Sequence, residues 1–500
     1  MRANSLNAVD SSSPLRVIAL ALCVVAVVLL APVRAAAQPL DSRLDSLIQR
    51  SKLGKTKIAV CAMEAATGQV LMSKSASDPM IPASNMKLLT AGAAVMVLGT
   101  DFTFRTELVW QPEARRFVIR GSGDPALADP KLLGQMNIGV EDLIRHWTTE
   151  ARKVAGPEGA DELVVDDRIF DREFRHPSWP GGQANRWYCA EVSGLMFYAN
   201  LLAIFPQPQG QGSPAVLKTE PSAPWLELRN KTRSVRQGQQ TVWAAWTGTG
   251  EVSVHGDVRY ATDPIELSLN NSPEFVARLA LDRFRRAGVP VKSARIASEN
   301  ESLAGGQVVQ VMQTRLEDVL NRCNMDSYNL YAEALFKRMG HEVSGGAGSF
   351  RNGASVVRMK MVEKLGAEAG RLMQVADGSG MSRNNRVTAS LLARWLAAMT
   401  KEGEAGRMFI RSIPGPGEGT MERRFDDKRL KGEVRAKSGY ISGVSTLSGY
   451  ITSKSSGRRV VFSILANDIP GNVGVARIKE FHEDVVALCD KWLADDESGE

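Results

Sequence analysis

The stretch PASNMKLLT, residues 82–90, begins a segment that is apolar almost all the way round. A proline and a serine suit the start of a helix, and Gly99 suits its end. A helix that is apolar on nearly every side is buried in the protein. The sequence therefore predicts a buried helix over 84–98, which begins at Ser84 and carries Lys87 three positions later.

The segments around this helix indicate a domain that is split along the chain. Residues 57–64 are expected to form a strand, and residues 69–72 begin its return partner after a turn. Late in the chain, strands are expected at 444–452 and 458–467. Between these regions, residues 101–265 contain short alternating segments and Gly- and Pro-rich turns. Helical spacing of apolar residues marks five further segments: 272–287, 315–339, 352–366, 388–402 and 474–494.

We therefore expect an α/β chain of the α+β type with more than one domain. A chain of 500 residues is long enough for this, because single cores stop growing near about 250–300 residues. The split domain is expected at 38–100 and 266–494, and the β-rich insertion at 101–265. Residues 495–500 form an acidic tail that we expect to be frayed.

The N-terminus resembles a secretory signal. Residues 1–37 combine a basic start, an apolar run over 17–31 and a small-residue A-x-A site before Gln38. The run is shorter than the roughly 20 residues that span a bilayer, although an uncleaved anchor is the alternative. We expect a secreted, periplasmic protein with no membrane span after cleavage.

The composition argues against nucleic-acid and metal chemistry. The net charge is +7, and no short Lys/Arg-rich run stands out, so no nucleic-acid partner is expected. The histidines at 146, 176, 255, 341 and 482 have no metal-binding spacing, which argues against a zinc site and a Ser-His-Asp triad. After signal cleavage four cysteines remain, and either burial or disulfide pairing is compatible with the sequence: Cys61, Cys189, Cys323 and Cys489.

The first candidate motif is Ser84-Asn85-Met86-Lys87. Positions three apart share one face of a helix, so the hydroxyl of Ser84 and the amine of Lys87 can meet. A serine hydroxyl is a weak nucleophile that needs an adjacent base. A lysine serves as that base only when burial or a second cation lowers its pKa.

The second candidate motif is Ser327-Tyr328-Asn329, near the start of a helical segment. A second serine beside the Ser–Lys pair can pass a proton to a leaving amine. The side chain of Asn329 can both donate to and accept from a substrate peptide bond. On its own, however, this motif is better explained as a helix cap.

The third candidate motif, Lys437-Ser438-Gly439, begins the late sheet. We expect Lys437 to lower the pKa of Lys87 and to attract a substrate carboxylate, which Ser438 can hydrogen-bond. Gly439 leaves room for a substrate chain along the strand edge. The backbone N–H of Tyr440 can form an oxyanion hole with that of Ser84. Alone, the motif is better explained as an ordinary exposed strand start.

The three motifs in this order are similar to those of class A β-lactamases and penicillin-binding proteins. The chain resembles one branch of these proteins more closely, the D-Ala-D-Ala carboxypeptidase/endopeptidase family of class C low-molecular-mass penicillin-binding proteins. That resemblance is carried by PASNMKLLT at 82–90, GSGDP at 121–125, DGSGMSR at 377–383 and RAKSG at 435–439.

The resemblance implies a fold and a function. The fold is the penicillin-binding, serine β-lactamase-like transpeptidase domain, an antiparallel sheet flanked by helices and split by a large insertion. The activity is that of a serine-type D-Ala-D-Ala carboxypeptidase, with endopeptidase action on cross-links as an additional activity known in the family. Peptidoglycan peptides are the substrate, β-lactams are inhibitors, and no metal or organic cofactor is needed. The oligomeric state is left open.

The chain departs from the family pattern at three positions. Tyr328 stands where Asp is usual, Ser438 stands where Thr is commoner, and Tyr440 is bulkier than the usual residue. These differences bear on substrate preference more than on mechanism. The turn at 377–380 lacks the first Gly of a nucleophile elbow, so we interpret it as a structural turn that borders the site. A serine β-lactamase and a non-catalytic wall-binding protein are the alternative functions.

Overall fold

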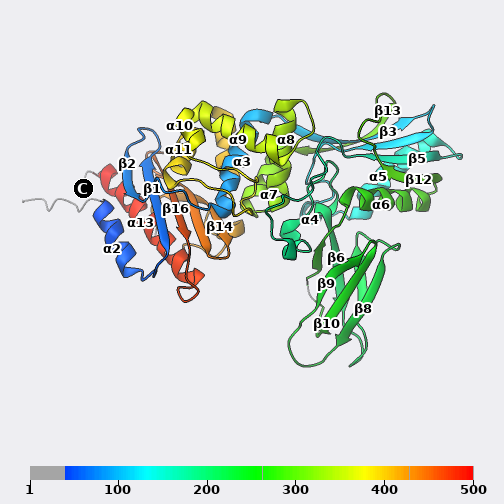
Figure 1. Ribbon diagram of the computed structural model, residues 1–500, viewed down its shortest axis with the longest axis horizontal. Helices are drawn as coiled ribbons and strands as arrows, with labels where there is room; N and C mark the ends of the chain where they lie inside the picture. Colours follow the sequence, from blue (N-terminus) through cyan, green and yellow to red (C-terminus); the bar gives the residue numbers. More distant parts are fainter. Residues whose placement is uncertain (1–39, 262, 427, 429, 499–500) are drawn as a thin grey trace, which may run out of the picture.

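The computed structural model describes residues 40–261, 263–426, 428 and 430–498. The predicted signal segment at 1–37 lies outside the described residues. No helix in the described ranges is long and apolar enough to cross a membrane. Figure 1 shows two regions side by side along the long axis, with the first and last described residues at the same end.

One antiparallel sheet joins the start of the described chain to its end. Its strand order is β14-β15-β16-β1-β2, and Lys57 of β1 faces Asn467 of β16. Every neighbouring pair is antiparallel, and the strands predicted at 57–64, 444–452 and 458–467 are confirmed. The strands are β1 (Lys57–Glu64), β2 (Val70–Lys74), β14 (Glu433–Ile441), β15 (Val444–Thr452) and β16 (Arg459–Asn467).

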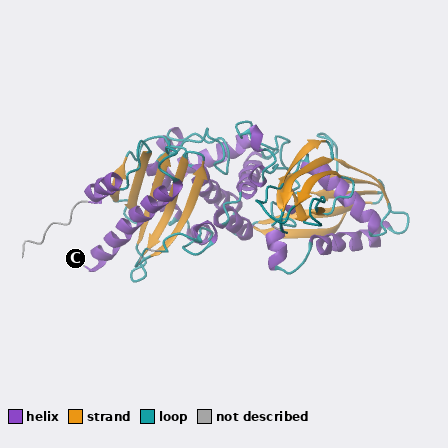
Figure 2. Cartoon of the chain, turned by 90° about the horizontal axis from the view of Figure 1, so that it is seen from below, coloured by secondary structure: helices purple, strands orange, loops and turns teal. Residues whose placement is uncertain are grey.

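Helices cover both faces of this sheet. Strand β1 contributes side chains to both faces. Ala59 and Cys61 belong to one core, and Val60 and Ala62 belong to the other. Figure 2 shows a long helix across one face. That face is covered by α2 (Leu40–Arg50) and α13 (Val475–Ser498). The opposite core contains α3 (Met86–Leu98), α7 (Leu316–Met325), α8 (Asn329–Ser344), α9 (Phe350–Leu365), α10 (Ala367–Arg371), α11 (Ala389–Met399) and α12 (Gly403–Arg411).

The insertion contains a mixed five-stranded sheet and a smaller all-β unit. The larger sheet has the order β12-β5-β4-β3-β13, and the smaller unit consists of two three-stranded sheets, β8-β10-β9 and β11-β6-β7. The helices are α4 (Pro130–Gln135), α5 (Val140–Ala155) and α6 (Ser272–Arg286). The strands are β3 (Thr103–Gln111), β4 (Arg116–Arg120), β5 (Ala160–Asp166), β6 (Leu201–Gln207), β7 (Val216–Glu220), β8 (Glu227–Ser234), β9 (Trp243–Gly248), β10 (Glu251–Val258), β11 (Ile265–Ser268), β12 (Val291–Ile296) and β13 (Gln307–Arg315).

The expected end of the insertion at residue 265 is too early. Strand β13 pairs with β3 until Arg315 faces Thr103, and β12 pairs with β5. Helix α6 belongs to the hydrophobic core of the same region. The amphipathic pattern of α6 predicts a helix correctly, but it does not specify the sheet on which that helix packs. We propose that the insertion spans 103–315 and that the split domain resumes at α7. This split domain is the proposed catalytic region.

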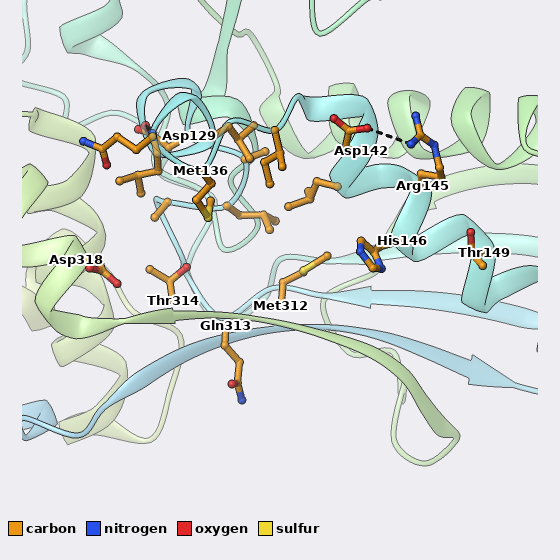
Figure 3. A pocket seen from close by; sticks show the side chains of 18 of the residues that line it. Asp129, Met136, Asp142, Arg145, His146, Thr149, Met312, Gln313, Thr314 and Asp318 are labelled. Atoms are coloured by element: carbon orange, nitrogen blue, oxygen red, sulfur yellow. Dashed lines mark hydrogen bonds and ion pairs between the residues drawn. The ribbon is translucent and has the colours of Figure 1, made fainter.

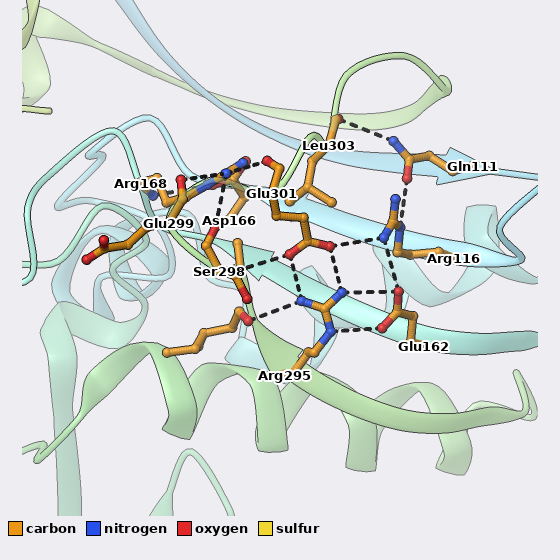
Figure 4. Close-up of polar contacts among 12 residues, drawn as sticks. Gln111, Arg116, Glu162, Asp166, Arg168, Arg295, Ser298, Glu299, Glu301 and Leu303 are labelled. Atoms are coloured by element: carbon orange, nitrogen blue, oxygen red, sulfur yellow. Dashed lines mark hydrogen bonds and ion pairs between the residues drawn. The ribbon is translucent and has the colours of Figure 1, made fainter. Parts of the chain in front are cut away.

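A network of two arginines and two glutamates links strands β12, β5 and β4 of the larger sheet (Figure 4). Arg295 of β12 donates to Glu162 of β5 at 2.9 Å and to Glu301 at 2.7 Å. Arg116 of β4 contacts the same two carboxylates at 3.1 Å each. The hydrogen bond from Arg295 lowers the pKa of Glu301 to about 2. The Arg295–Glu301 pair therefore stays charged at neutral pH and holds the 298–303 loop against the strands.

The four cysteines of the described chain are free and buried. Burial raises the pKa of each thiol. Of the two alternatives that the sequence left open, the structure therefore favours small buried apolar side chains over disulfides.

His482 lies fully buried in α13 without a hydrogen-bond partner. Neither ring nitrogen has one among the described residues. Burial holds the pKa of His482 well below its usual value, and the neighbouring Arg424 and Lys479 lower it further. The ring is therefore neutral in the folded protein at neutral pH.

We predict that His482 makes the protein less stable as the pH falls below about 6.5. In that range the unfolded chain binds a proton at His482 and the folded chain does not, so the unfolded state gains up to about 1.4 kcal/mol per pH unit. The free energy of unfolding, measured by urea denaturation at pH 7.5 and 5.5, should fall less in His482→Leu than in the parent protein. Equal falls would contradict the assignment.

Candidate active site

The partly exposed Ser84 and the fully buried Lys87 lie within hydrogen-bond distance of one another. Residues Ala83–Asn85 form a single 3₁₀ turn that leads into α3, so the predicted helix begins with a tighter turn than expected. Lys87 is fully buried, and its Nζ donates to Ser84 Oγ at 3.1 Å. The same Nζ donates to Asn329 Oδ1 at 2.7 Å and to the Ser379 carbonyl at 2.9 Å.

The second motif lies where the helical segment predicted at 315–339 breaks into α7 and α8. Ser327, in this break, has a φ of +58°, an unusual backbone conformation for a serine. Its Oγ accepts a hydrogen bond from Lys437 Nζ at 2.8 Å. Asn329 begins α8 and donates to the Tyr188 carbonyl at 2.9 Å. The break thus allows Ser327 to contact Lys437 while Asn329 contacts Lys87.

Strand β14 carries the third motif along the side of the Ser84 turn. Lys437 is fully buried, Ser438 is partly exposed and Tyr440 is 59% exposed. Asn85 reinforces the contact, because its Nδ2 donates to the Lys437 carbonyl at 2.6 Å. The structure therefore brings Lys437 together with the first two motifs and leaves Tyr440 at the protein surface.

Gly439 has a structural role that the sequence did not reveal. A Cβ at this position would lie 2.3 Å from Thr446 Oγ1 and 2.9 Å from the Ser84 backbone nitrogen. The glycine therefore allows β14 to approach the Ser84 turn closely. The room for a substrate chain that we expect at Gly439 stays a prediction.

Burial sets the charge properties of the two lysines. Burial lowers the pKa of Lys87 to about 8, while Cys323, Glu333 and Asp377 act in the opposite direction. Burial also holds the pKa of Lys437 well below its usual value, and the nearby Lys87 lowers it further. The repulsion expected between the two ammonium groups therefore acts alongside burial, and it lowers the pKa of Lys437.

Glu333 is a buried carboxylate beside the site that the motifs did not reveal. It lies one turn after Asn329 on α8 and accepts backbone hydrogen bonds from Gly378 at 2.8 Å and Ser379 at 2.7 Å. Burial, with Asp377 nearby, raises the pKa of Glu333 to about 8. The sequence offers one signal for Glu333. It lies four residues after Asn329, on the same helix face, within an otherwise apolar stretch.

The turn at 377–380 borders the site, as interpreted from the sequence. Asp377 accepts from the backbone of Gly380 at 2.9 Å and of Ser382 at 2.6 Å. Trp179 of the insertion donates to the same carboxylate at 2.8 Å. Glu333 thus fixes the turn from α8, and Asp377 fixes it from within. In this position the Ser379 carbonyl accepts the hydrogen bond from Lys87.

Tyr328 packs among aromatic rings. Its ring centroid lies 5.2 Å from that of Trp187, 5.5 Å from that of Tyr331 and 5.0 Å from the guanidinium of Arg322. Only 9% of Tyr328 is exposed. The aromatic residue at the middle of the second motif therefore packs the insertion against α7 and α8.

A separate pocket of about 780 Å³ lies between the insertion and the start of α7, which contributes Asp318 (Figure 3). Helix α5 contributes His146 and Thr149 to its wall, and β13 contributes Met312. None of the predicted site residues lines it. Among the described residues, no group of three or more His, Cys, Asp or Glu side chains is arranged to hold a metal ion.

Comparison with known proteins identifies the family of the chain. The D-Ala-D-Ala carboxypeptidase 3 (S13) family model matches residues 40–490. A D-alanyl-D-alanine carboxypeptidase from Actinomadura sp. (strain R39) is 28% identical over 471 residues, which cover 87% of this chain and 82% of that protein. D-alanyl-D-alanine carboxypeptidase DacB from Haemophilus influenzae is 24% identical over 433 residues, covering 79% and 82%.

A solved structure supports the same fold. The crystal structure of penicillin binding protein 4 from Haemophilus influenzae matches with a TM-score of 0.71 and 19% identity, covering 89% of this chain and 98% of that one. The fold expected from the sequence is thereby confirmed. Because the family model spans both the sheet and all three motifs, the chain belongs to the D-Ala-D-Ala carboxypeptidase 3 (S13) family.

Proposed function

We propose that this serine-type D-Ala-D-Ala carboxypeptidase acts through an acyl-enzyme on Ser84. One observation carries the assignment: the fully buried amine of Lys87 lies 3.1 Å from Ser84 Oγ. Lys87 makes its three hydrogen bonds to a hydroxyl, an amide oxygen and a backbone carbonyl. Without a directly bonded carboxylate, its neutral form is accessible near neutral pH, as a general base requires.

Acylation begins when neutral Lys87 accepts the proton of Ser84. The Ser84 oxygen attacks the carbonyl carbon of the D-Ala-D-Ala bond and forms a tetrahedral intermediate. Collapse of the intermediate breaks the C–N bond, and the leaving amine takes up the proton that Lys87 received. Ser327 relays that proton, a role supported by its 2.8 Å hydrogen bond to Lys437. Water then attacks the acyl-serine while neutral Lys87 accepts its proton, and Lys87 returns that proton to the Ser84 oxygen as the C–O bond of the ester breaks.

Substrate orientation is assigned to the two segments beside Ser84. Lys437 and Ser438 bind the terminal carboxylate of the substrate, and Asn329 orients its peptide bond. The backbone N–H groups of Ser84 and Tyr440 form the oxyanion hole. The close approach of β14 at Gly439 supports this pairing, since the Ser84 nitrogen lies beside the strand.

Peptidoglycan peptides are the proposed substrate and β-lactams the proposed inhibitors. We place the protein in the periplasm after export, on the basis of the predicted signal segment. Membership of a carboxypeptidase family favours this activity over the β-lactamase and non-catalytic alternatives. Activity on cross-linked peptides remains a prediction.

The activity is tested by release of D-Ala from a soluble pentapeptide that ends in D-Ala-D-Ala. The parent protein should release D-Ala, and Ser84→Ala should lower kcat by at least about 10³-fold, because no other group replaces the nucleophile. Ser438→Ala serves as a control, since it removes only a carboxylate contact and should mainly raise KM. Equal turnover by the parent protein and Ser84→Ala would contradict the assignment.

The pH profile tests Lys87 as the base. Acylation needs the neutral amine, so the rate should rise as the pH increases through about 8 and then level off. In Glu333→Gln the rise should move to lower pH, because the charge that Glu333 gains as the pH passes about 8 favours the protonated lysine. The plateau should also fall, since one amide cannot accept both turn N–H groups.

Glu342→Gln is the matched control for this profile. It makes the same chemical change on the exposed face of the same helix, where Glu342 pairs with Arg338 at 2.8 Å. This variant should keep the parent profile. A Glu333→Gln profile that is identical to that of the parent would exclude Glu333 from positioning the base.

A further inference from the structure

The small sheet β8-β10-β9 presents an outer face that the catalytic assignment does not use. Figure 1 shows this sheet projecting away from the rest of the molecule. Its inner face is packed, because Val252 and Val254 belong to the core of the insertion and Trp246 Nε1 donates to the Ser268 carbonyl at 2.7 Å. Residues with the opposite alternation therefore face outward.

One row of this outer face crosses all three strands. Lys231 of β8 pairs in register with His255 of β10, which pairs in register with Trp243 of β9. The Trp243 and His255 rings are stacked, with centroids 4.5 Å apart and planes at 7°. Trp243 nevertheless remains 50% exposed. The row thus contains a flat aromatic surface that is open to solvent.

The neighbouring row on the same face fixes the orientation of the imidazole. It contains Arg229 of β8, Ser253 of β10 and Ala245 of β9, which pair in register. The hydroxyl of the buried Ser253 lies 2.6 Å from His255 Nε2. The imidazole that stacks on Trp243 is therefore held in place, and the exposed part of the indole is available to a flat ring.

The charges of β8 leave one cation unpaired on this face. Arg229 pairs with Glu251 at 2.5 Å, and Arg233 pairs with Asp257 at 2.9 Å. Exposed Lys231, between them, makes no ion pair with any residue that the structure describes. This lysine is therefore available to bind an external carboxylate at one end of the aromatic row.

We propose that this face binds the glycan strand of peptidoglycan, with a sugar ring on Trp243 and a stem-peptide carboxylate on Lys231. The proposal rests on the proposed function, which supplies the polymer. The C–H face of a sugar carries partial positive charge and packs on the negative face of an aromatic ring. Acidic stem peptides complement Lys231. Because the sheet projects from the molecule, it suits a polymer that extends beyond the bond being cut.

Binding is tested with purified, insoluble peptidoglycan sacculi. In a Ser84→Ala background, Trp243→Ala should weaken co-sedimentation about five- to tenfold, and Lys231→Ala should weaken it about two- to fivefold. Trp243→Phe should retain most of the binding, because it keeps an aromatic ring. Met136→Ala, which truncates an exposed apolar side chain elsewhere in the insertion, should leave binding unchanged.

The enzyme with Ser84 intact separates this proposal from the proposed function. Trp243→Ala should release D-Ala from a soluble pentapeptide at the parent rate and from sacculi more slowly. A parent protein that releases no D-Ala from the soluble pentapeptide would instead refute the proposed function. Unchanged co-sedimentation of Trp243→Ala would overturn the inference. Loss with Lys231→Ala alone would also overturn it, because that result would mean general charge adsorption without a sugar platform.

Discussion

The site depends on one constraint, the complete burial of the Lys87 amine beside Ser84. Burial lowers the pKa of this lysine toward neutrality, and it also obliges the protein to provide hydrogen-bond acceptors for the amine. Those acceptors come from three segments far apart in sequence: the Ser84 turn, the start of α8 at Asn329 and the Ser379 turn. The fold of the catalytic region is what brings these segments together.

Two glycines permit the close approaches that this arrangement needs. A Cβ at Gly439 would meet the Ser84 nitrogen from β14, and a Cβ at Gly380 would lie 1.8 Å from the Ala83 carbonyl. The Ser84 turn is therefore held between the strand and the 377–380 turn. Glu333 and Asp377 accept backbone hydrogen bonds from that second turn, which connects the buried carboxylates to the position of Lys87.

The sequence predicted the parts of the structure that local pattern determines. The apolar run after Ser84, the hairpin that precedes it and the late strands follow from the spacing of apolar residues and from turn residues. The boundary at 265 was wrong, because the pattern of α6 does not identify the sheet on which it packs. The break at Ser327 was hidden within a continuous helical pattern, and the role of Gly439 depends on a contact between distant segments. The catalytic roles of the site residues rest on motif order and geometry, and they remain predictions.

Peptide mapping after brief exposure to benzylpenicillin tests the central claim most directly. The account predicts a long-lived penicilloyl adduct on the peptide that contains Ser84, and no adduct in Ser84→Ala. A folded parent protein that forms no adduct and leaves penicillin intact would contradict the acyl-serine mechanism, as would an adduct on any other residue. Rapid consumption of penicillin without a stable adduct would instead identify a β-lactamase.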